Sequence, residues 1–266
     1  MDDREASLLW EENAEVWTLL ARSGWDIFRD HFNTPAFFDL LPDVDGRTGL
    51  DIGCGEGHNT RLLTQRGARV YAIDIAPTFV KHAKQAAGSV EYAIASGQML
   101  PFPAAAFDFV TAFMSLMDLP QPQIALGEAE RVLKPGGFLQ FSITHPCFDT
   151  PHRRRIRDAQ GKTIAMEVGG YYQAPDGQID EWIFHTAPRE VTAGLRKFRI
   201  PRFQRTIADW LNMSVEAGLV IERVSEPRAT DEAAARFPTL QGTQVVPFFL
   251  HIRCRKPWVK RVPKST

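Results

Sequence analysis

The sequence predicts an α/β protein built on a doubly wound, mostly parallel sheet with helices on both faces. From about residue 48 onward, short apolar segments alternate with amphipathic helical segments, which is the order typical of such a sheet. In addition, the apolar strand that ends near Asp51 runs into three alternating glycines and then a helix. Glycines at a strand-to-helix turn let the backbone approach a bound molecule closely, because no Cβ atom intervenes.

The elements are predicted in order along the chain. Residues 4–38 carry apolar and aromatic side chains at helical spacing and are expected to form helices, which Pro42 and Gly46 separate from the first strand. The alternating region is expected to contain strands at 48–53, 69–74, 90–95, 107–113 and 138–144, helices at 58–67, 77–87 and 121–133, and a turn at 134–137.

The alternation stops after residue 145. The segment 146–204 is rich in Gly, Pro, Arg and aromatic residues and is expected to form an antiparallel cap. Its strand-like pieces are at 163–168, 180–186 and 195–200, and beyond it we expect a helix at 206–217, a short helix at 231–236 and strands at 219–226 and 245–253. The predicted divisions are an N-terminal helical lid (1–44), a core (45–145), the cap (146–204), the rest of the core (205–254) and a mobile basic tail (255–266).

Composition limits the functional classes. The 266 residues are 44% hydrophobic and 24% charged, with a formal net charge of −1, so no global positive field attracts the chain to nucleic acid. No run of about 18 apolar residues is present to span a membrane. Three widely spaced cysteines and the absence of carboxylate sets at ligand spacing predict neither a disulfide framework nor a metal site. We therefore expect a cytoplasmic protein.

The glycine loop distinguishes between two kinds of nucleotide site. A dinucleotide site has the pattern Gly-x-Gly-x-x-Gly, with the helix N-terminus directed at a pyrophosphate. Here the third glycine comes one residue early, giving Gly53-x-Gly55-x-Gly57, and Asp51 precedes the first. A carboxylate at this place repels a pyrophosphate and attracts a cation. Asp74, at the end of the next strand, is placed to accept hydrogen bonds from two ribose hydroxyls.

This pattern resembles the first motif of the class I S-adenosylmethionine-dependent methyltransferases, and the closest similarity is to the group acting on small molecules. Two further stretches resemble the same family, Gln98–Pro103 with the entry into strand four and Arg131–Gly137 before strand five. The resemblance implies a Rossmann-like sheet of seven strands with the last antiparallel. It also implies S-adenosyl-L-methionine as the cofactor, a small-molecule acceptor, and methyl transfer to O, N or C.

The same resemblance assigns the cofactor-binding residues. They are Asp51, Gly53, Cys54, Gly55, Gly57, Asp74, Ile75, Ser96, Gln98, Met99 and Met114. Asp74 is expected to bind the ribose, and Ile75 to lie beside the adenine. In many relatives an acidic residue in the third loop meets the adenine amino group, whereas this sequence has Ser96 there. Ser96 or Gln98 is expected to supply the polar contact, with Met99 as an apolar wall.

The sequence indicates the catalytic groups less clearly. His145 stands at the carboxyl end of strand five and is a candidate general base, with a structural hydrogen bond as the alternative. Asp118 follows strand four and is a candidate for orienting an amine or hydroxyl, or for capping a helix. The candidate substrate-lining residues are Trp17, Tyr171, Tyr172 and His185.

Three alternatives remain open from sequence. The basic run His152–Arg157 is interpreted as a solvated loop face, with contact to a phosphate or carboxylate as the alternative. The whole protein could be a module that binds S-adenosylmethionine or S-adenosylhomocysteine without catalysis, or a nicotinamide-dependent oxidoreductase. The glycine spacing and Asp51 argue against the oxidoreductase. The oligomeric state is not encoded in any pattern we recognise.

Overall fold

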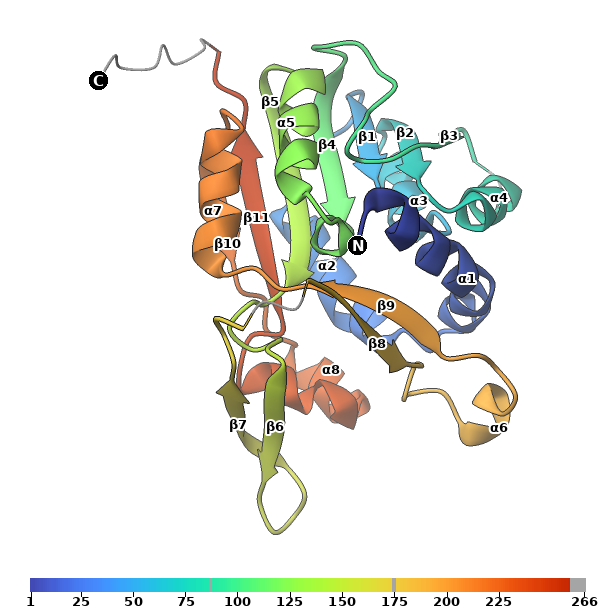
Figure 1. The fold of residues 1–266 in the computed structure, drawn as a ribbon, viewed down its shortest axis with the longest axis vertical. Helices are drawn as coiled ribbons and strands as arrows, with labels where there is room; N and C mark the ends of the chain where they lie inside the picture. Colours follow the sequence, from blue (N-terminus) through green and yellow to red (C-terminus); the bar gives the residue numbers. More distant parts are fainter. Residues whose placement is uncertain (87, 174–175, 259–266) are drawn as a thin grey trace.

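The computed structural model describes residues 1–86, 88–173 and 176–258, and its centre is a seven-stranded sheet (Figure 1). The strand order is β10-β11-β5-β4-β1-β2-β3, and β11 is antiparallel to both of its neighbours while the other pairs are parallel. Its strands are β1 (Thr48–Ile52), β2 (Arg69–Asp74), β3 (Glu91–Ile94), β4 (Phe107–Phe113), β5 (Leu133–Thr144), β10 (Val220–Ser225) and β11 (Phe249–Arg255). The predicted fold class is confirmed.

Helices cover both faces of this sheet because alternate side chains of each strand point to opposite sides. Phe109 and Phe138 stack on each other at 5.6 Å and pack with residues of α2 (Thr34–Leu40) and α3 (His58–Gln65). Their strand neighbours Val110 and Leu139 belong to the opposite core, together with α5 (Pro122–Val132) and α7 (Ile207–Glu216). The core of the protein therefore consists of two apolar layers on either side of the sheet.

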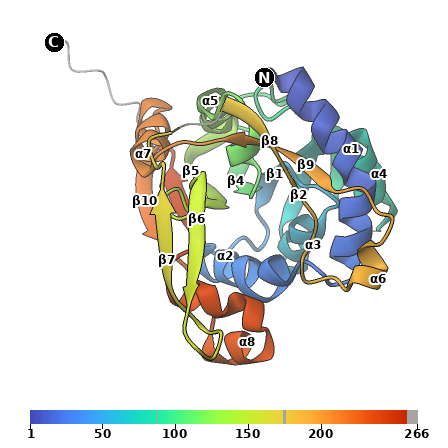
Figure 2. The same ribbon diagram turned by 60° about the horizontal axis from the view of Figure 1, so that its bottom comes forward.

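Two further parts of the chain gather at the carboxyl ends of the parallel strands (Figure 2). The first is α1 (Asp3–Arg22), which begins with a capping box and is followed by a π-helix at Arg29–Asn33. The second is the insert, with hairpin β6 (His152–Arg157) and β7 (Thr163–Gly169), the pair β8 (Asp176–Trp182) and β9 (Phe198–Phe203), and the short helix α6 (Arg189–Thr192). Between β10 and β11 lie α8 (Asp231–Arg236) and a 3-10 segment at Pro238–Gln244, and α4 (Pro77–Gln85) lies between β2 and β3.

An apolar cluster joins these two parts. Trp17 and Leu20 of α1 pack against Phe198 of β9, and the rings of Trp17 and Phe198 are 4.7 Å apart. Asn13 adds two hydrogen bonds with the backbone of Arg199, each 2.9 Å long. The N-terminal helix and the insert therefore form one packed unit above the sheet.

Some predicted elements were wrong in detail. The strand predicted to start at 138 starts at Leu133, because residues 134–137 form a bulge within β5 and not a separate turn. Residues 152–157, interpreted as a loop face, form strand β6, because they pair with β7. The strands predicted at 180–186 and 195–200 lie at 176–182 and 198–203. Arg255, placed in the mobile tail, pairs with Phe138 in the sheet, and residues 259–266 of that tail lie outside the described residues.

None of the helices in the described part of the chain combines the length and the apolar character needed to cross a membrane.

Candidate active site

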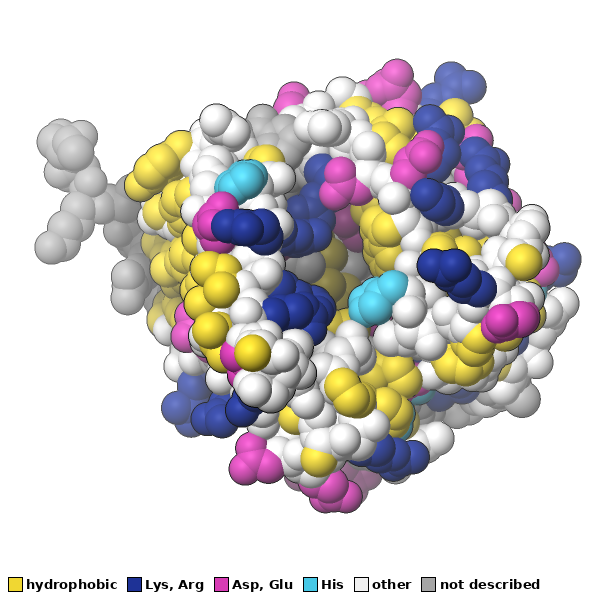
Figure 3. Space-filling model, turned by 90° about the horizontal axis from the view of Figure 1, so that it is seen from below, with side chains coloured by type: hydrophobic (Ala, Val, Ile, Leu, Met, Phe, Trp, Pro, Cys, Tyr) yellow, Lys and Arg dark blue, Asp and Glu magenta, His cyan; other side chains and the backbone are white. Residues whose placement is uncertain are grey.

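A cavity of about 890 Å³ opens at the carboxyl ends of the strands, where ligands bind in open α/β sheets. Its walls come from the loops after β1, β2, β3, β4 and β5, from α1 and the π-helix, from the insert, and from the start of β11. Seen from this end, the molecule has a hollow with apolar side chains inside and charged ones at its rim (Figure 3). The volume lies within the range of small-molecule and cofactor sites.

The glycine loop is held by the strand beside it. The N–H groups of Gly53 and Cys54 donate to the carbonyl of Ile73, at 2.8 and 2.9 Å. Gly55 lies on the cavity wall with φ at +55°, and a Cβ atom built there meets no protein atom within 4 Å. A Cβ on Gly57 would lie 2.6 Å from the Tyr92 hydroxyl, and Gly57 does not line the cavity. The loop thus presents Gly53, Cys54 and Gly55 to a ligand, while Gly57 packs against protein.

Asp51 lies at the bottom of the cavity and is 2% exposed. Its carboxylate accepts hydrogen bonds from the hydroxyls of Thr60, at 2.6 Å, and Thr111, at 2.9 Å. Burial raises its pKa, and these two hydroxyls act against that rise. The two threonines fix the carboxylate in one orientation beside the glycine loop.

Asp74 is placed in the same way at the end of β2. Its Oδ2 accepts a hydrogen bond from the N–H of Gly55 at 2.8 Å, and its Oδ1 accepts one from Ala76 at 3.0 Å. Burial raises its pKa to about 6, so the carboxyl is mostly ionised at neutral pH. A carboxylate oxygen can accept two hydrogen bonds, so each oxygen has room for one more. Ile75, the next residue, also lines the cavity.

The third loop is arranged differently from the prediction. Ser96, Gln98 and Met99 do not line the cavity, and Met99 is 77% exposed. The Ser96 hydroxyl instead donates to the carboxylate of Asp3 at 2.7 Å, and the Gln98 amide donates to its other oxygen. Asp3, at the start of α1, does line the cavity. A carboxylate is therefore present at the third loop, but it comes from the N-terminal helix.

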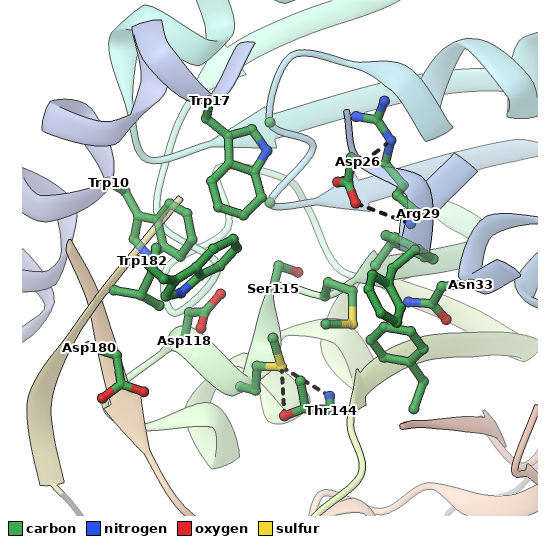
Figure 4. A pocket seen from close by; sticks show the side chains of 18 of the residues that line it. Trp10, Trp17, Asp26, Arg29, Asn33, Ser115, Asp118, Thr144, Asp180 and Trp182 are labelled. Carbon is green, nitrogen blue, oxygen red and sulfur yellow. Dashed lines mark hydrogen bonds and ion pairs between the residues drawn. The ribbon is translucent and has the colours of Figure 1, made fainter. Parts of the chain in front are cut away.

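The loop after β4 contributes Met114 and Asp118 to the cavity wall. Met114 has φ at +53°, and its N–H donates to the carbonyl of Ser142 at 2.9 Å. The Asp118 carboxyl makes no hydrogen bond to any other described residue, and burial raises its pKa to about 8 against a lowering by Arg202. Figure 4 shows Asp118 beside Trp182, at a distance from Asp26 and Arg29. Asp118 is therefore largely protonated at neutral pH, in reach of a bound ligand.

The sequence analysis did not identify one further carboxyl of the cavity, that of Asp26. Asp26 lines the cavity and accepts a hydrogen bond from the N–H of Arg29 at 3.1 Å. Burial raises its pKa to about 6, and the Arg29 charge opposes this. Asp26 belongs to the link between α1 and the π-helix, where neither periodicity nor a motif marks it. Only its tertiary position distinguishes it from an ordinary helix-capping aspartate.

His145 lies away from the cavity, contrary to its assignment as a candidate base. It is 1% exposed, its Nε2 is 2.9 Å from Glu226 Oε1, and its Nδ1 accepts a hydrogen bond from the N–H of Cys147 at 3.2 Å. Both ring nitrogens are engaged, so the geometry favours the structural hydrogen bond that was its alternative.

The four substrate candidates divide into two pairs. Trp17 and His185 line the cavity, but Tyr171 and Tyr172 do not. The Tyr171 hydroxyl accepts a hydrogen bond from the backbone of Ile207 at 3.0 Å, and Tyr172 is 87% exposed. The two tyrosines lie in the connection between β7 and β8, and their rings contact each other at 5.0 Å.

The N-terminal helix is tied directly to the glycine loop. Glu56, 4% exposed, receives hydrogen bonds from Arg22 of α1 and from Arg61 of α3, each at 2.9 Å. The two guanidinium groups lower the pKa of Glu56 against its burial. The N-terminal helix and the glycine loop are therefore linked by ion pairs to the buried carboxylate of Glu56.

Comparison with known proteins identifies the family. Residues 50–141 match the family described as "Methyltransferase domain". A solved S-adenosylmethionine-dependent methyltransferase from Mesorhizobium loti superposes with a TM-score of 0.67 at 25% identity, covering 83% of this chain and 96% of that one. Residues 50–141 are a methyltransferase domain, and that is the part of the chain to which the family match extends. Such domains use S-adenosylmethionine, and the geometry of Gly55 and Asp74 fits its ribose.

Curated relatives of this methyltransferase domain differ in what they act on. Trans-aconitate 2-methyltransferase of Azoarcus sp. (strain BH72) is 35% identical over 147 residues, which are 53% of this chain and 57% of the relative. Demethylmenaquinone methyltransferase of Tropheryma whipplei (strain Twist) is 35% identical over 152 residues, 54% of this chain and 63% of the relative. The chain thus spans less than two thirds of these relatives.

Proposed function

We propose that this protein transfers a methyl group from S-adenosylmethionine to a small-molecule acceptor at an O, N or C atom. One observation carries the proposal: Gly55 and Asp74 line the same cavity as Asp118 and the aromatic roof. The names of the relatives, which include trans-aconitate 2-methyltransferase and demethylmenaquinone methyltransferase, support a small-molecule acceptor. The acceptors that these names indicate differ too much to identify the acceptor of this protein.

The cofactor half of the cavity is assigned residue by residue. Asp74 accepts the ribose hydroxyls, and the backbone of Gly53–Gly55 borders the amino-acid portion, with Asp51 attracting its ammonium. Ile75 flanks the adenine, and Asp3 takes the place of the acidic residue that the third loop lacks. Bound there, the cofactor supplies an electrophilic methyl group on a sulfonium ion. The protein's own contribution is to orient the two reactants and exclude water.

The acceptor half lies under the roof, between α1, the insert and the loop after β4. We propose that residues 1–44 and 146–204 act together as its lid over the core segments 45–145 and 205–254. Trp17 and Trp182 give this half an apolar, desolvating wall. Asp118, with no other described hydrogen-bond partner, is the group we assign to orient the acceptor and take its proton. A raised pKa makes Asp118 a stronger base once it is ionised.

Partners and location follow from the same features. Of the arginines in the basic run, Arg153 pairs with Asp149 and Arg154 with Glu167, which supports the absence of a nucleic-acid partner. Cys54, Cys147 and Cys254 are all free thiols, which suits a reducing compartment, and we place the protein in the cytoplasm.

The first test separates binding from chemistry. Calorimetry should detect the binding of both S-adenosylmethionine and S-adenosylhomocysteine. A methyl-labelled cofactor should transfer its label to a component of a metabolite extract. Asp118→Asn should keep the binding of S-adenosylhomocysteine and lose most of the transfer, because the amide cannot accept a proton. Binding without transfer to any extract would favour the non-catalytic module. Failure to bind either form of the cofactor would refute the proposal altogether.

A further inference from the structure

We propose that Arg155, at the mouth of the cavity, binds an anionic group, a carboxylate or a phosphate, carried by the methyl acceptor. The inference deepens the proposed function and rests on it for the identity of the occupant. Among the described residues, the arginines around the cavity are all paired with carboxylates except at one position.

Five arginines of the described chain line the cavity, and four of them have acidic partners. These partners are Asp30 and Asp26 for Arg29, Asp149 for Arg153 and Arg202, and Glu167 for Arg154. Arg155 has no carboxylate within ion-pair distance among the described residues, and its guanidinium donates no hydrogen bond to them. A half-buried guanidinium with five unused donors is a binding site for an anion.

The surroundings of Arg155 bring four distant parts of the chain together at the rim. Its guanidinium lies 5.7 Å from the centre of the Phe248 ring. Phe248 stacks on Phe28 at 5.9 Å, and the Phe28 ring lies 6.1 Å from His185. The rim of the hollow in Figure 3 shows basic side chains and a histidine around an apolar interior. An anion at Arg155 would thus have an apolar wall on its inner side.

His185 adds a hydrogen-bonding imidazole to this rim without adding a second charge. Burial and the positive charge of Arg155 lower its pKa, so it is neutral at neutral pH. Its Nε2 lies 3.0 Å from the Thr239 hydroxyl. The charge that selects an anion therefore comes from Arg155, and any contribution of His185 is a hydrogen bond.

The cavity has opposite polarity at its two ends. The deep end carries the carboxyl groups of Asp51 and Asp74, beside which we place the positive cofactor. On the wall formed by the insert, the carboxylates are already paired with arginines: Asp149 with Arg153 and Arg202, Asp180 with Arg202, and Glu181 with Arg199. An acceptor with an anionic group is repelled from the deep end and attracted to the mouth, so its other end points inward to the methyl group. The apolar side chains between the two ends of the cavity suit an acceptor whose middle part is apolar.

The experiment uses probes of matched shape, with saturating S-adenosylhomocysteine and low salt. The probes are 3-phenylpropionate, phenyl phosphate and the neutral 3-phenylpropionamide, and binding is followed by the fluorescence of the tryptophans in the cavity wall. The wild-type protein should bind at least one anionic probe roughly tenfold or more tightly than the amide, since a charge-assisted pair is lost with the amide. The carboxylate and phosphate arms show which anion is preferred.

Two variants then locate the effect. Arg155→Met should abolish the preference for the anion, and Arg155→Lys should keep part of it. Arg157→Met is the matched control, because Arg157 lies on the same strand, donates to the carbonyl of Gly161, and does not line the cavity. It should leave the preference unchanged.

Each contrary result overturns the inference. Equal binding of the amide and both anions by the wild type would do so without any variant, as would no binding of either anion. If Arg155→Met and Arg157→Met lost the preference for the anion equally, a general electrostatic field and not a site at Arg155 would attract the anion. Binding of S-adenosylhomocysteine is measured separately, so its failure would refute the proposed function while a preference for anions at Arg155 could still stand.

Discussion

Replacing Asp74 by alanine is expected to weaken the binding of S-adenosylhomocysteine between tenfold and a hundredfold. Each oxygen of this carboxylate already accepts one backbone N–H, from Gly55 or Ala76, and retains one acceptor position for a ribose hydroxyl. A hydrogen bond to a charged group contributes roughly 1.5–3 kcal/mol, so two amount to at least about 3 kcal/mol, or about a hundredfold in affinity. Water that enters the vacated site recovers part of this loss.

The pH dependence provides a second signature of the same carboxylate. Burial raises the pKa of Asp74 to about 6 in the ligand-free protein. The ribose hydroxyls donate to the ionised form and favour it, so affinity should rise as pH increases through about 6 and level off above it. In Asp74→Ala this part of the pH dependence should disappear. Calorimetry in buffers of different ionisation enthalpy measures the affinity and the proton released on binding.

The control for this prediction is Asp108→Ala. Asp108 also accepts a backbone N–H, from Thr48 at 2.9 Å, and pairs with Lys134, but it does not line the cavity. Both variants lose a backbone contact, so a general loss of stability should affect both. If Asp74→Ala binds with wild-type affinity, or if Asp108→Ala loses as much, the ribose assignment is wrong.

The remaining predictions concern the glycine loop, the lid and the base. Gly55→Val should abolish cofactor binding while the protein stays folded. Gly161→Val, also at a positive φ in open space, should lower the stability by a similar amount and leave cofactor binding unchanged. Thermal melts measure the stability of both variants, and calorimetry measures their binding. Hydrogen exchange in residues 1–40 and 146–204 should slow when S-adenosylhomocysteine is added, and unchanged exchange would exclude a lid. Asp118→Asn should stabilise the ligand-free protein, and denaturant titrations should show a larger gain at pH 8 than at pH 5.

The glycine loop after β1 and the position of Asp74 could be predicted from sequence because their determinants are local. The strand, the glycine loop and the helix from Leu50 to Gln65 follow one another without a gap, and their hydrogen bonds join adjacent elements. Asp74 ends a strand that pairs with β1 in a fixed parallel register. Alternation of apolar residues and the positions of glycine therefore suffice to place both.

The rest of the site depends on contacts between distant segments, which no local pattern records. His145 stands at the end of β5, as predicted, but its ring is drawn outward by Glu226, 81 residues later. Asp3 reaches Ser96 across 93 residues, and Asn13 reaches Arg199 across 186. Sequence spacing could not show which side of the strand His145 would face, or that α1 would supply the missing carboxylate.

The buried carboxyls of this cavity connect its chemistry with its stability. Burial raises the pKa of Asp118 from its ordinary value of 3.8 to about 8, so between these values the folded state holds a proton that the unfolded state has lost. Its contribution therefore makes the ligand-free protein less stable as pH rises from about 4 to about 8, with no further change above that. Asp26 and Asp74, whose pKa values are raised to about 6, act in the same direction up to that pH. An asparagine at position 118 removes the largest of these shifts and also removes the proton acceptor. Retaining a desolvated aspartate thus costs folding stability and supplies a base whose strength suits an acceptor that must lose a proton.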